Sequence, residues 1–128
     1  MRKKNKIYFE WLLKAQEDEQ AAKILLEENG PSALICFLSH QIAEKSLKGY
    51  LVYQNKEFPK IHHLDLLLEM SMKIDQKFSK IKKEILYLRP FYFQTRYPGE
   101  FPQYTKIQAK KSFQNALIVK DFILKSLI

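Results

Sequence analysis

The stretch HQIAEKSLKGYLVY, residues 40–53, decides the fold of this chain. Its apolar residues recur at three- and four-residue steps, the period of one helix face: Ile42, Ala43, Leu47 and Leu51. A polar row follows the same period: Gln41, Glu44, Lys45 and Lys48. This row is either a solvated face with i, i+4 ion pairs, or a polar seam or pocket between helices. Gly49 costs a helix about 1 kcal/mol relative to alanine, so we expect another helix to pass close to it.

The same period predicts helices on both sides of this stretch. We expect helical segments over residues 6–28, 32–54, 62–75, 78–92 and 105–128. Asn29-Gly30-Pro31 stops the first, Ser32 and Thr105 are candidate caps, and Arg89-Pro90 interrupts the fourth. We therefore predict an all-α fold, an antiparallel up-and-down four-helix bundle core with an additional helix or helical segment. It forms a single domain over residues 1–128.

Length and composition agree with one folded helical domain. The chain has 128 residues, of which 46% are hydrophobic, with three Gly and five Pro. Cys36 is the only cysteine, so no intramolecular disulfide can form and we expect an inert buried thiol. Glu10 and Lys14 interrupt the apolar part of a signal-like N-terminus, and no apolar run is long enough to span a membrane. We expect a cytoplasmic protein without membrane association.

The net charge of +8 favours an anionic partner such as RNA or a nucleotide. Nearly all of this charge is lysine, and dispersed lysine also serves as a solubilising surface. The charge alone leaves both interpretations open.

Asp18 is the residue of the first helix that does not fit its position. It follows the apolar stripe of that helix, where burial of a lone carboxylate is costly. Lys45 and Lys48 on the next antiparallel helix can supply a cation. A polar seam or pocket lined by Asp18, Gln41, Glu44 and Lys45 is therefore weighed against the solvated face.

The loop FYFQTRYPGEFPQYT, residues 91–105, is the only long region without a helical pattern. Arg96 stands among several tyrosines and phenylalanines, a combination suited to gripping a phosphate and stacking a base. Pro98 favours an extended Tyr97, which directs Arg96 and Tyr97 to opposite sides. The alternative is an aromatic plug that closes the end of the bundle, with Arg96 paired to a carboxylate.

Metal, cofactor and nucleophile signals are weak. His62 and His63 are neighbours, so on a helix they point about 100° apart and do not bind one ion together. We expect one of them to cap a helix or pack on an aromatic ring. The three glycines are isolated and form no phosphate loop. We expect no metal and no cofactor.

The chain resembles the HEPN family, small helical domains of prokaryotes, along nearly its whole length. The resemblance is carried by Trp11, Ala15, Asp18 and Ala22, and by HQIAEKSLK (40–48), HHL (62–64) and TRYP (95–98). It implies a four-helix up-and-down core with added helical elements and a homodimer. It also implies two activities. Many HEPN proteins partner a minimal nucleotidyltransferase, often as toxin–antitoxin pairs, and others are metal-independent endoribonucleases.

The ribonuclease pattern of the family is incomplete here. In that pattern four to six residues separate an arginine from a histidine, whereas the corresponding positions after Arg96 hold Phe101, Pro102 and Gln103. Histidine is the usual proton shuttle near neutral pH, so we lean against an enzyme. A ribonuclease would need His40 or His62 brought to Arg96 by the fold or a dimer.

The leading hypothesis is a non-catalytic HEPN module that binds a nucleotide, RNA or a nucleotidyltransferase partner. Candidate ligand-binding residues are Arg96, Tyr97, Tyr104 and, if they face outward, Lys45 and Lys48. Asp18, Gln41 and Glu44 would organise the polar seam. The alternatives are an endoribonuclease with a degenerate Arg–His site and a purely structural helical adaptor.

Overall fold

The computed structural model describes residues 3–96, 98 and 103–127. Its helices are α1 (Lys3–Glu27), α2 (Ser32–Tyr53), α3 (Leu64–Ile74), the 3₁₀ helix η1 (Gln76–Ile81), α4 (Lys82–Leu88), α5 (Phe91–Gln94) and α6 (Lys106–Ser126). No strand occurs in these ranges. The all-α prediction is confirmed.

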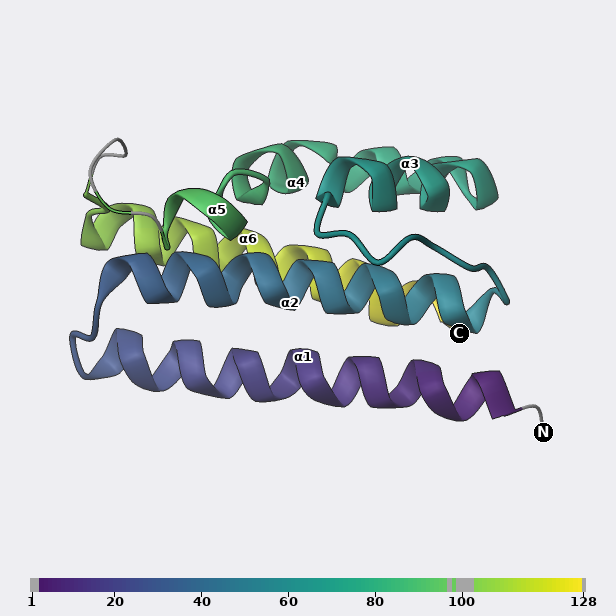
Figure 1. Ribbon diagram of the computed structural model, residues 1–128, viewed down its shortest axis with the longest axis horizontal. Coiled ribbons are helices and arrows are strands. Elements are labelled where there is room, and N and C mark those ends of the chain that lie inside the picture. The colour runs from purple at the N-terminus through teal and green to yellow at the C-terminus, as the bar shows by residue number, and fades with distance from the viewer. Residues whose placement is uncertain (1–2, 97, 99–102, 128) are drawn as a thin grey trace.

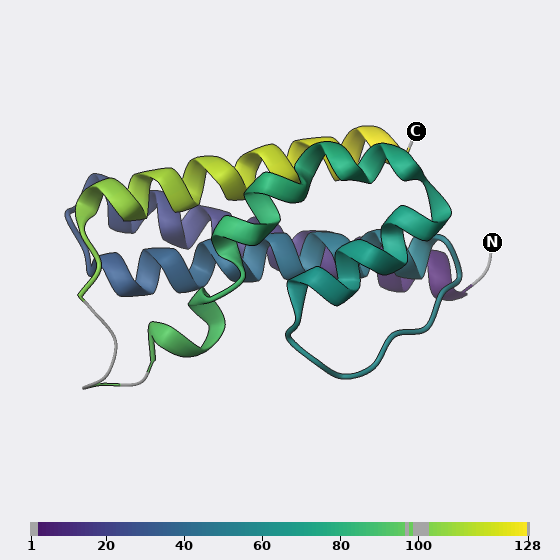
Figure 2. The ribbon, with the colours of Figure 1, turned by 90° about the horizontal axis from the view of Figure 1, so that it is seen from above.

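The helices form layers around α2 (Figure 1). α1 packs antiparallel along one side of α2 as an outer layer, and α6 packs along another side. α3 and the η1–α4 segment return over α2 and α6, with α4 beside α6 (Figure 2). Because α2 contacts α1, α3, α4, α5 and α6, its side chains are covered on nearly every face.

The core follows the predicted apolar stripes. Its fully buried members come from every layer and include Ile42, Leu47, Leu67, Ile85 and Ile123. None of the helices in the described ranges has the length and apolar character needed to cross a bilayer.

Gly49 confirms the expected close approach of two helices. A Cβ atom there would lie 3.1 Å from Leu12 Cδ2 and 3.4 Å from Trp11 Cβ, both on α1. The missing side chain lets α1 and α2 approach each other at this level. The packing gained there offsets the low helix propensity of glycine.

The predicted fourth helix, residues 78–92, has the predicted interruption at Arg89-Pro90 and a second one that was not predicted, between η1 and α4. Asp75 has extended backbone and its side chain accepts a hydrogen bond from the Lys77 backbone nitrogen, which starts η1 as a tight 3₁₀ turn before α4. Pro90 then ends α4, because proline disfavours helix in the preceding residue and has no N–H to donate. The apolar period persists across both breaks, so the proline predicts the second break, whereas periodicity does not reveal the first.

Of the two predicted helix caps, one is wrong and one is confirmed. Ser32 is not a cap: Pro31 occupies the N-cap position without a side-chain bond, and its carbonyl accepts from the Ile35 nitrogen. Thr105 does cap α6, in a capping box with Gln108 that satisfies two end groups reciprocally. This cap fixes where the chain returns to the bundle after the loop.

Candidate functional site

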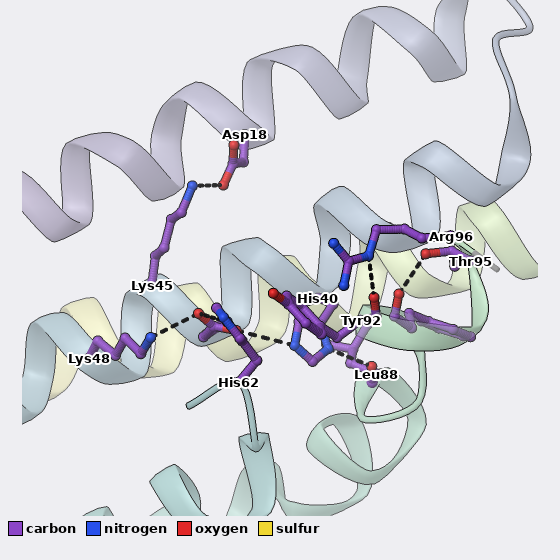
Figure 3. A network of polar contacts seen from close by, with 11 residues as sticks. Asp18, His40, Lys45, Lys48, His62, Leu88, Tyr92, Thr95 and Arg96 are labelled. Carbon is purple, nitrogen blue, oxygen red and sulfur yellow. Dashed lines mark hydrogen bonds and ion pairs between the residues drawn. The ribbon is translucent and has the colours of Figure 1, made fainter. Parts of the chain in front are cut away.

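Glu44 is the centre of a polar cluster inside the bundle (Figure 3). It lies in the middle of α2 with 2% of its surface exposed. Lys48, one turn further along α2, donates to Oε2 over 2.9 Å. His62 Nδ1, from the segment before α3, lies 3.0 Å from both carboxylate oxygens. The nearest approach of His40 Nε2 to Oε1 is 3.4 Å, without the alignment of a hydrogen bond.

This environment keeps the Glu44 carboxylate ionised. Burial by itself would raise its pKa, but His40, Lys48 and His62 together outweigh burial and lower the pKa from 4.5 to about 2. A carboxylate only accepts hydrogen bonds, so His62 Nδ1 carries the hydrogen of that contact. The His62 side chain is 41% exposed, and its other ring nitrogen, Nε2, is the one left for a ligand.

His40 has a different position from His62. It is fully buried, and its Nδ1 donates to the Leu88 carbonyl over 3.0 Å, which ties α2 to the end of α4. Its ring lies 5.6 Å from the ring of Tyr92. Of the two histidines considered for catalysis, only His62 stands at the surface.

Tyr92 on α5 brings His62 and Arg96 together. The His62 ring stacks on the Tyr92 ring, with centroids 3.9 Å apart and planes 12° apart. The Arg96 guanidinium carbon lies 4.2 Å from the same centroid and 5.3 Å from that of Phe37. This confirms the expectation that one histidine of the pair packs on an aromatic ring.

The backbone at the end of α5 fixes the direction of Arg96. Its Nε donates to the Tyr92 carbonyl over 2.7 Å, and its backbone nitrogen donates to the Phe93 carbonyl. Thr95 Oγ1 donates to the Phe91 carbonyl in the same turn. Within the described ranges Arg96 is exposed and has no carboxylate partner. The two terminal nitrogens of Arg96 are donors, and His62 Nε2 is an acceptor when Nδ1 carries the hydrogen; all three lie near the half-buried Tyr92 ring.

The predicted polar seam consists of two separate parts. Asp18 pairs with Lys45 across α1 and α2 over 2.7 Å, so the missing partner of Asp18 is found. Gln41 Oε1 is buried without a hydrogen bond from the described residues. Glu44 belongs to the second part, the cluster with Lys48 and His62.

The two lysines do not present free charge at the surface. Lys48 is 5% exposed, and its nitrogen also lies over the rings of Trp11 and Phe58, at 5.3 and 5.6 Å. Lys45 is engaged by Asp18. The condition attached to their proposed ligand-binding role, that they face outward, is not met by Lys48.

The residues of the loop also fall into two groups, one packed against the bundle and one exposed. Tyr104 donates to Gln94 Oε1 over 3.0 Å and packs edge-on against Phe91, 5.5 Å away. This aromatic packing agrees with the plug interpretation, whereas Arg96 is exposed and lacks, within the described ranges, the carboxylate partner which that interpretation expects. Tyr97 and Phe101 lie outside the described residues.

The sequence indicates His62, Glu44 and Arg96, but not their association around Tyr92. Glu44 and His62 are eighteen residues apart and belong to different elements, so no helical spacing could pair them. Phe37 was missed altogether, because an aromatic residue on α2 gives no signal of its own. In the described part of the chain no three His, Cys, Asp or Glu side chains are grouped to hold a metal ion.

Comparison with known proteins gives one family. The family model described as HEPN domain matches residues 8–127. Two crystal structures are similar in fold, both with a TM-score of 0.77. ST0689, an archaeal HEPN homologue, is 24% identical and is aligned over 94% of this chain and 98% of its own. TT1696 from Thermus thermophilus is 22% identical, with 92% and 96% aligned. No curated protein matches the chain. The family match spans nearly the whole sequence, and the chain belongs to the HEPN domain family.

Proposed function

We propose that this chain is a HEPN module that binds a phosphate group of a nucleotide or RNA at the surface formed by Arg96, Tyr92 and His62. The observation that carries the proposal is the shared contact of the Arg96 guanidinium and the His62 imidazole with the Tyr92 ring. A guanidinium presents several donors in a fixed plane and is well suited to phosphate oxygens.

Local charge supports an anionic ligand. The negative charge of Glu44 is buried and compensated by Lys48, so it weakens the field at the surface little. Arg96 is exposed at the proposed binding surface and adds a positive charge there. Both the guanidinium and the imidazole are already placed by Tyr92, which reduces the entropy that a ligand must remove on binding.

Recognition on this surface is directed at the phosphate rather than at a base. The Tyr92 ring is taken up by two protein groups, so it holds the site together and is not a free stacking platform. Sequence-independent binding through the backbone is the expected mode.

The test is a titration of the protein with adenosine monophosphate and with a single-stranded RNA. Arg96→Ala should weaken binding of both at least tenfold, since a charge-assisted contact is worth about 1.5–3 kcal/mol. Arg89→Ala is the matched control, because Arg89 is also exposed and lies 3.5 Å from Asp65 on the neighbouring helix. Equal effects of the two variants would contradict the proposal.

A further part of the proposal concerns proteins. We also propose, on the family resemblance, that this module forms a homodimer and pairs with a nucleotidyltransferase in a toxin–antitoxin system. If neither nucleotide nor RNA binds, pull-down with the product of a neighbouring nucleotidyltransferase gene tests this role, and failure there leaves the structural adaptor.

The second candidate function is a metal-independent endoribonuclease, favoured by the contact between His62 Nδ1 and the ionised Glu44. A carboxylate on Nδ1 holds the ring in the tautomer in which Nε2 can accept a proton. Nε2 would take the proton of a ribose 2′-hydroxyl while its oxygen attacks the adjacent phosphorus. The bond to the 5′-oxygen then breaks, that oxygen takes a proton from water, and a 2′,3′-cyclic phosphate remains. Arg96 would stabilise the charge on the phosphate oxygens.

Cleavage is tested on a labelled RNA in the presence of EDTA. The enzyme predicts products with 2′,3′-cyclic phosphate ends, lost in His62→Gln and in Arg96→Ala. Binding by the wild type without such products would reject the enzyme and keep the binding module.

A further inference from the structure

A group of lysines runs from the end of α3 through η1 to the start of α4, apart from the site of Arg96. Five of the chain's 22 basic residues fall between residues 73 and 83: Lys73, Lys77, Lys80, Lys82 and Lys83. All five are exposed, and none forms an ion pair with a carboxylate in the described ranges. Part of the net charge is therefore concentrated and uncompensated here.

The 3₁₀ geometry of η1 aligns part of this charge. With three residues per turn, side chains at i and i+3 lie above one another, about 6 Å apart along the axis. Lys77 and Lys80 have this spacing within η1, and Lys83 follows three residues later on α4. We call these three residues the η1 lysine row. The spacing of Lys77 and Lys80 is comparable to the distance between successive phosphates of an extended nucleic-acid strand.

Two acids stand beside the row, but within the described ranges neither forms an ion pair with it. Asp75 accepts a hydrogen bond from the Lys77 backbone nitrogen at the start of η1. Glu84 follows the row, with Oε1 buried and no hydrogen bond from the described residues. The positive surface continues onto α6, where the Lys111 nitrogen lies 4.9 Å from the ring of Tyr87 on α4. α6 packs against both η1 and α4.

The apolar residues of η1 argue against a membrane surface as its partner. Phe78 and Ile81 point into the core, so η1 has no large apolar side chain to insert into a bilayer. What it presents is a regular series of ammonium groups, which neutralises phosphates without reading bases.

We propose that the η1 lysine row binds the phosphate backbone of single-stranded RNA. It is a second contact surface, on a different part of the fold from Arg96 and His62. It deepens the proposed function, on which the assignment of RNA as ligand rests, because a mononucleotide would not need it. RNA long enough to reach both surfaces is then the preferred ligand.

The experiment compares two triple variants with equal loss of charge, using fluorescence anisotropy of a labelled single-stranded RNA of about 20 nucleotides at several salt concentrations. The test variant is Lys77→Gln/Lys80→Gln/Lys83→Gln. The control is Lys23→Gln/Lys56→Gln/Lys60→Gln, three exposed lysines elsewhere on the chain. Thermal unfolding of each variant confirms that the fold is retained.

The test variant should bind the RNA roughly tenfold more weakly at low salt. Its slope of log K against log salt should fall by about 2, since each phosphate contact on a single strand contributes about 0.7. The control should change affinity less than about threefold. Equal effects of the two triple variants, or no RNA binding by the wild type, would overturn the inference.

Arg96→Ala and adenosine monophosphate separate this inference from the proposed function. Loss of RNA binding in the lysine variant, with wild-type behaviour of Arg96→Ala, supports the η1 lysine row and contradicts the site at Arg96. The reverse result overturns the row and keeps the site. Binding of adenosine monophosphate should not change in the lysine variant, and a parallel loss of it would mean that the row acts through the site and would overturn the inference.

Discussion

Glu44 and Arg96 carry opposite charges in neighbouring parts of one network, yet their surroundings differ completely. Glu44 is buried in the middle of α2, where it accepts hydrogen bonds from Lys48 and His62, and His40 Nε2 lies 3.4 Å away. Arg96 is exposed at the end of α5 and contacts a carbonyl and two rings. The carboxylate of Glu44 is neutralised by groups inside the protein, whereas the guanidinium of Arg96 remains available to a ligand. His62 belongs to both, since it bonds Glu44 and stacks on Tyr92.

The largest expected effect is that of removing Glu44. Glu44→Ala leaves Lys48 buried without its counter-charge and should lower the free energy of unfolding by about 3–5 kcal/mol. Urea denaturation measures the loss. Removing both charges, as Glu44→Gln/Lys48→Met, should recover at least half of it. If the single variant costs no more than an exposed carboxylate, the contrast between the two regions is wrong.

Acid should weaken the buried cluster in a defined range of pH. The pKa of Glu44 is about 2 in the folded chain, below its ordinary value of 4.5, so the unfolded state takes up the proton first as pH falls. The stabilisation is complete above pH 4.5 and is lost progressively between 4.5 and about 2. It is on the order of 3 kcal/mol. In the Glu44→Gln variant the free energy of unfolding should lack this part of its pH dependence. The same pH dependence in the variant and the wild type would contradict this role of Glu44.

Asp18 and Lys45 provide an intermediate case. Their side chains are 17% and 21% exposed, so the pair is neither buried like Glu44 nor free like Arg96. Asp18→Asn should lower the free energy of unfolding by about 1 kcal/mol. The exposed pair of Lys14 and Glu17 is the control, and Glu17→Gln should change stability by only a few tenths of a kcal/mol. If the two variants lose the same free energy of unfolding, burial does not determine how much each of these ion pairs contributes to stability.

The smallest effect on stability is expected at Arg96. Arg96→Ala removes an exposed side chain and should change the free energy of unfolding by less than about 0.5 kcal/mol, although it weakens phosphate binding. Thermal and urea unfolding measure the first quantity. A loss of more than about 2 kcal/mol would mean that Arg96 is a structural residue of the plug.

The sequence predicts the helices well because their information is local. Apolar spacing located α1 and α2, Gly49 indicated the close approach of α1, and Thr105 indicated the start of α6. The interruption at Arg89-Pro90 was predicted, but the 3₁₀ helix η1 was missed, since it depends on the side chain of Asp75 while the apolar period continues unbroken.

The site is less predictable because it is tertiary. Asp18 is a carboxylate on the apolar stripe of α1, which predicted a cationic partner, and Lys45 was correctly considered for that role. Nothing in the spacing of Glu44 and His62, or of His62 and Arg96, indicates that they meet around Tyr92. Lys48 was considered as an outward charge, but Trp11 and Phe58 cover it.

The most direct test of the account is a histidine ¹H–¹⁵N NMR titration with a short single-stranded RNA. His62 stands at the proposed phosphate surface, while His40 is fully buried and serves as the internal control. We predict that the His62 ring signals shift on titration, that those of His40 do not, and that the shift disappears in Arg96→Ala. Saturating RNA binding with an unchanged His62, or the same shift in Arg96→Ala, would contradict the phosphate site.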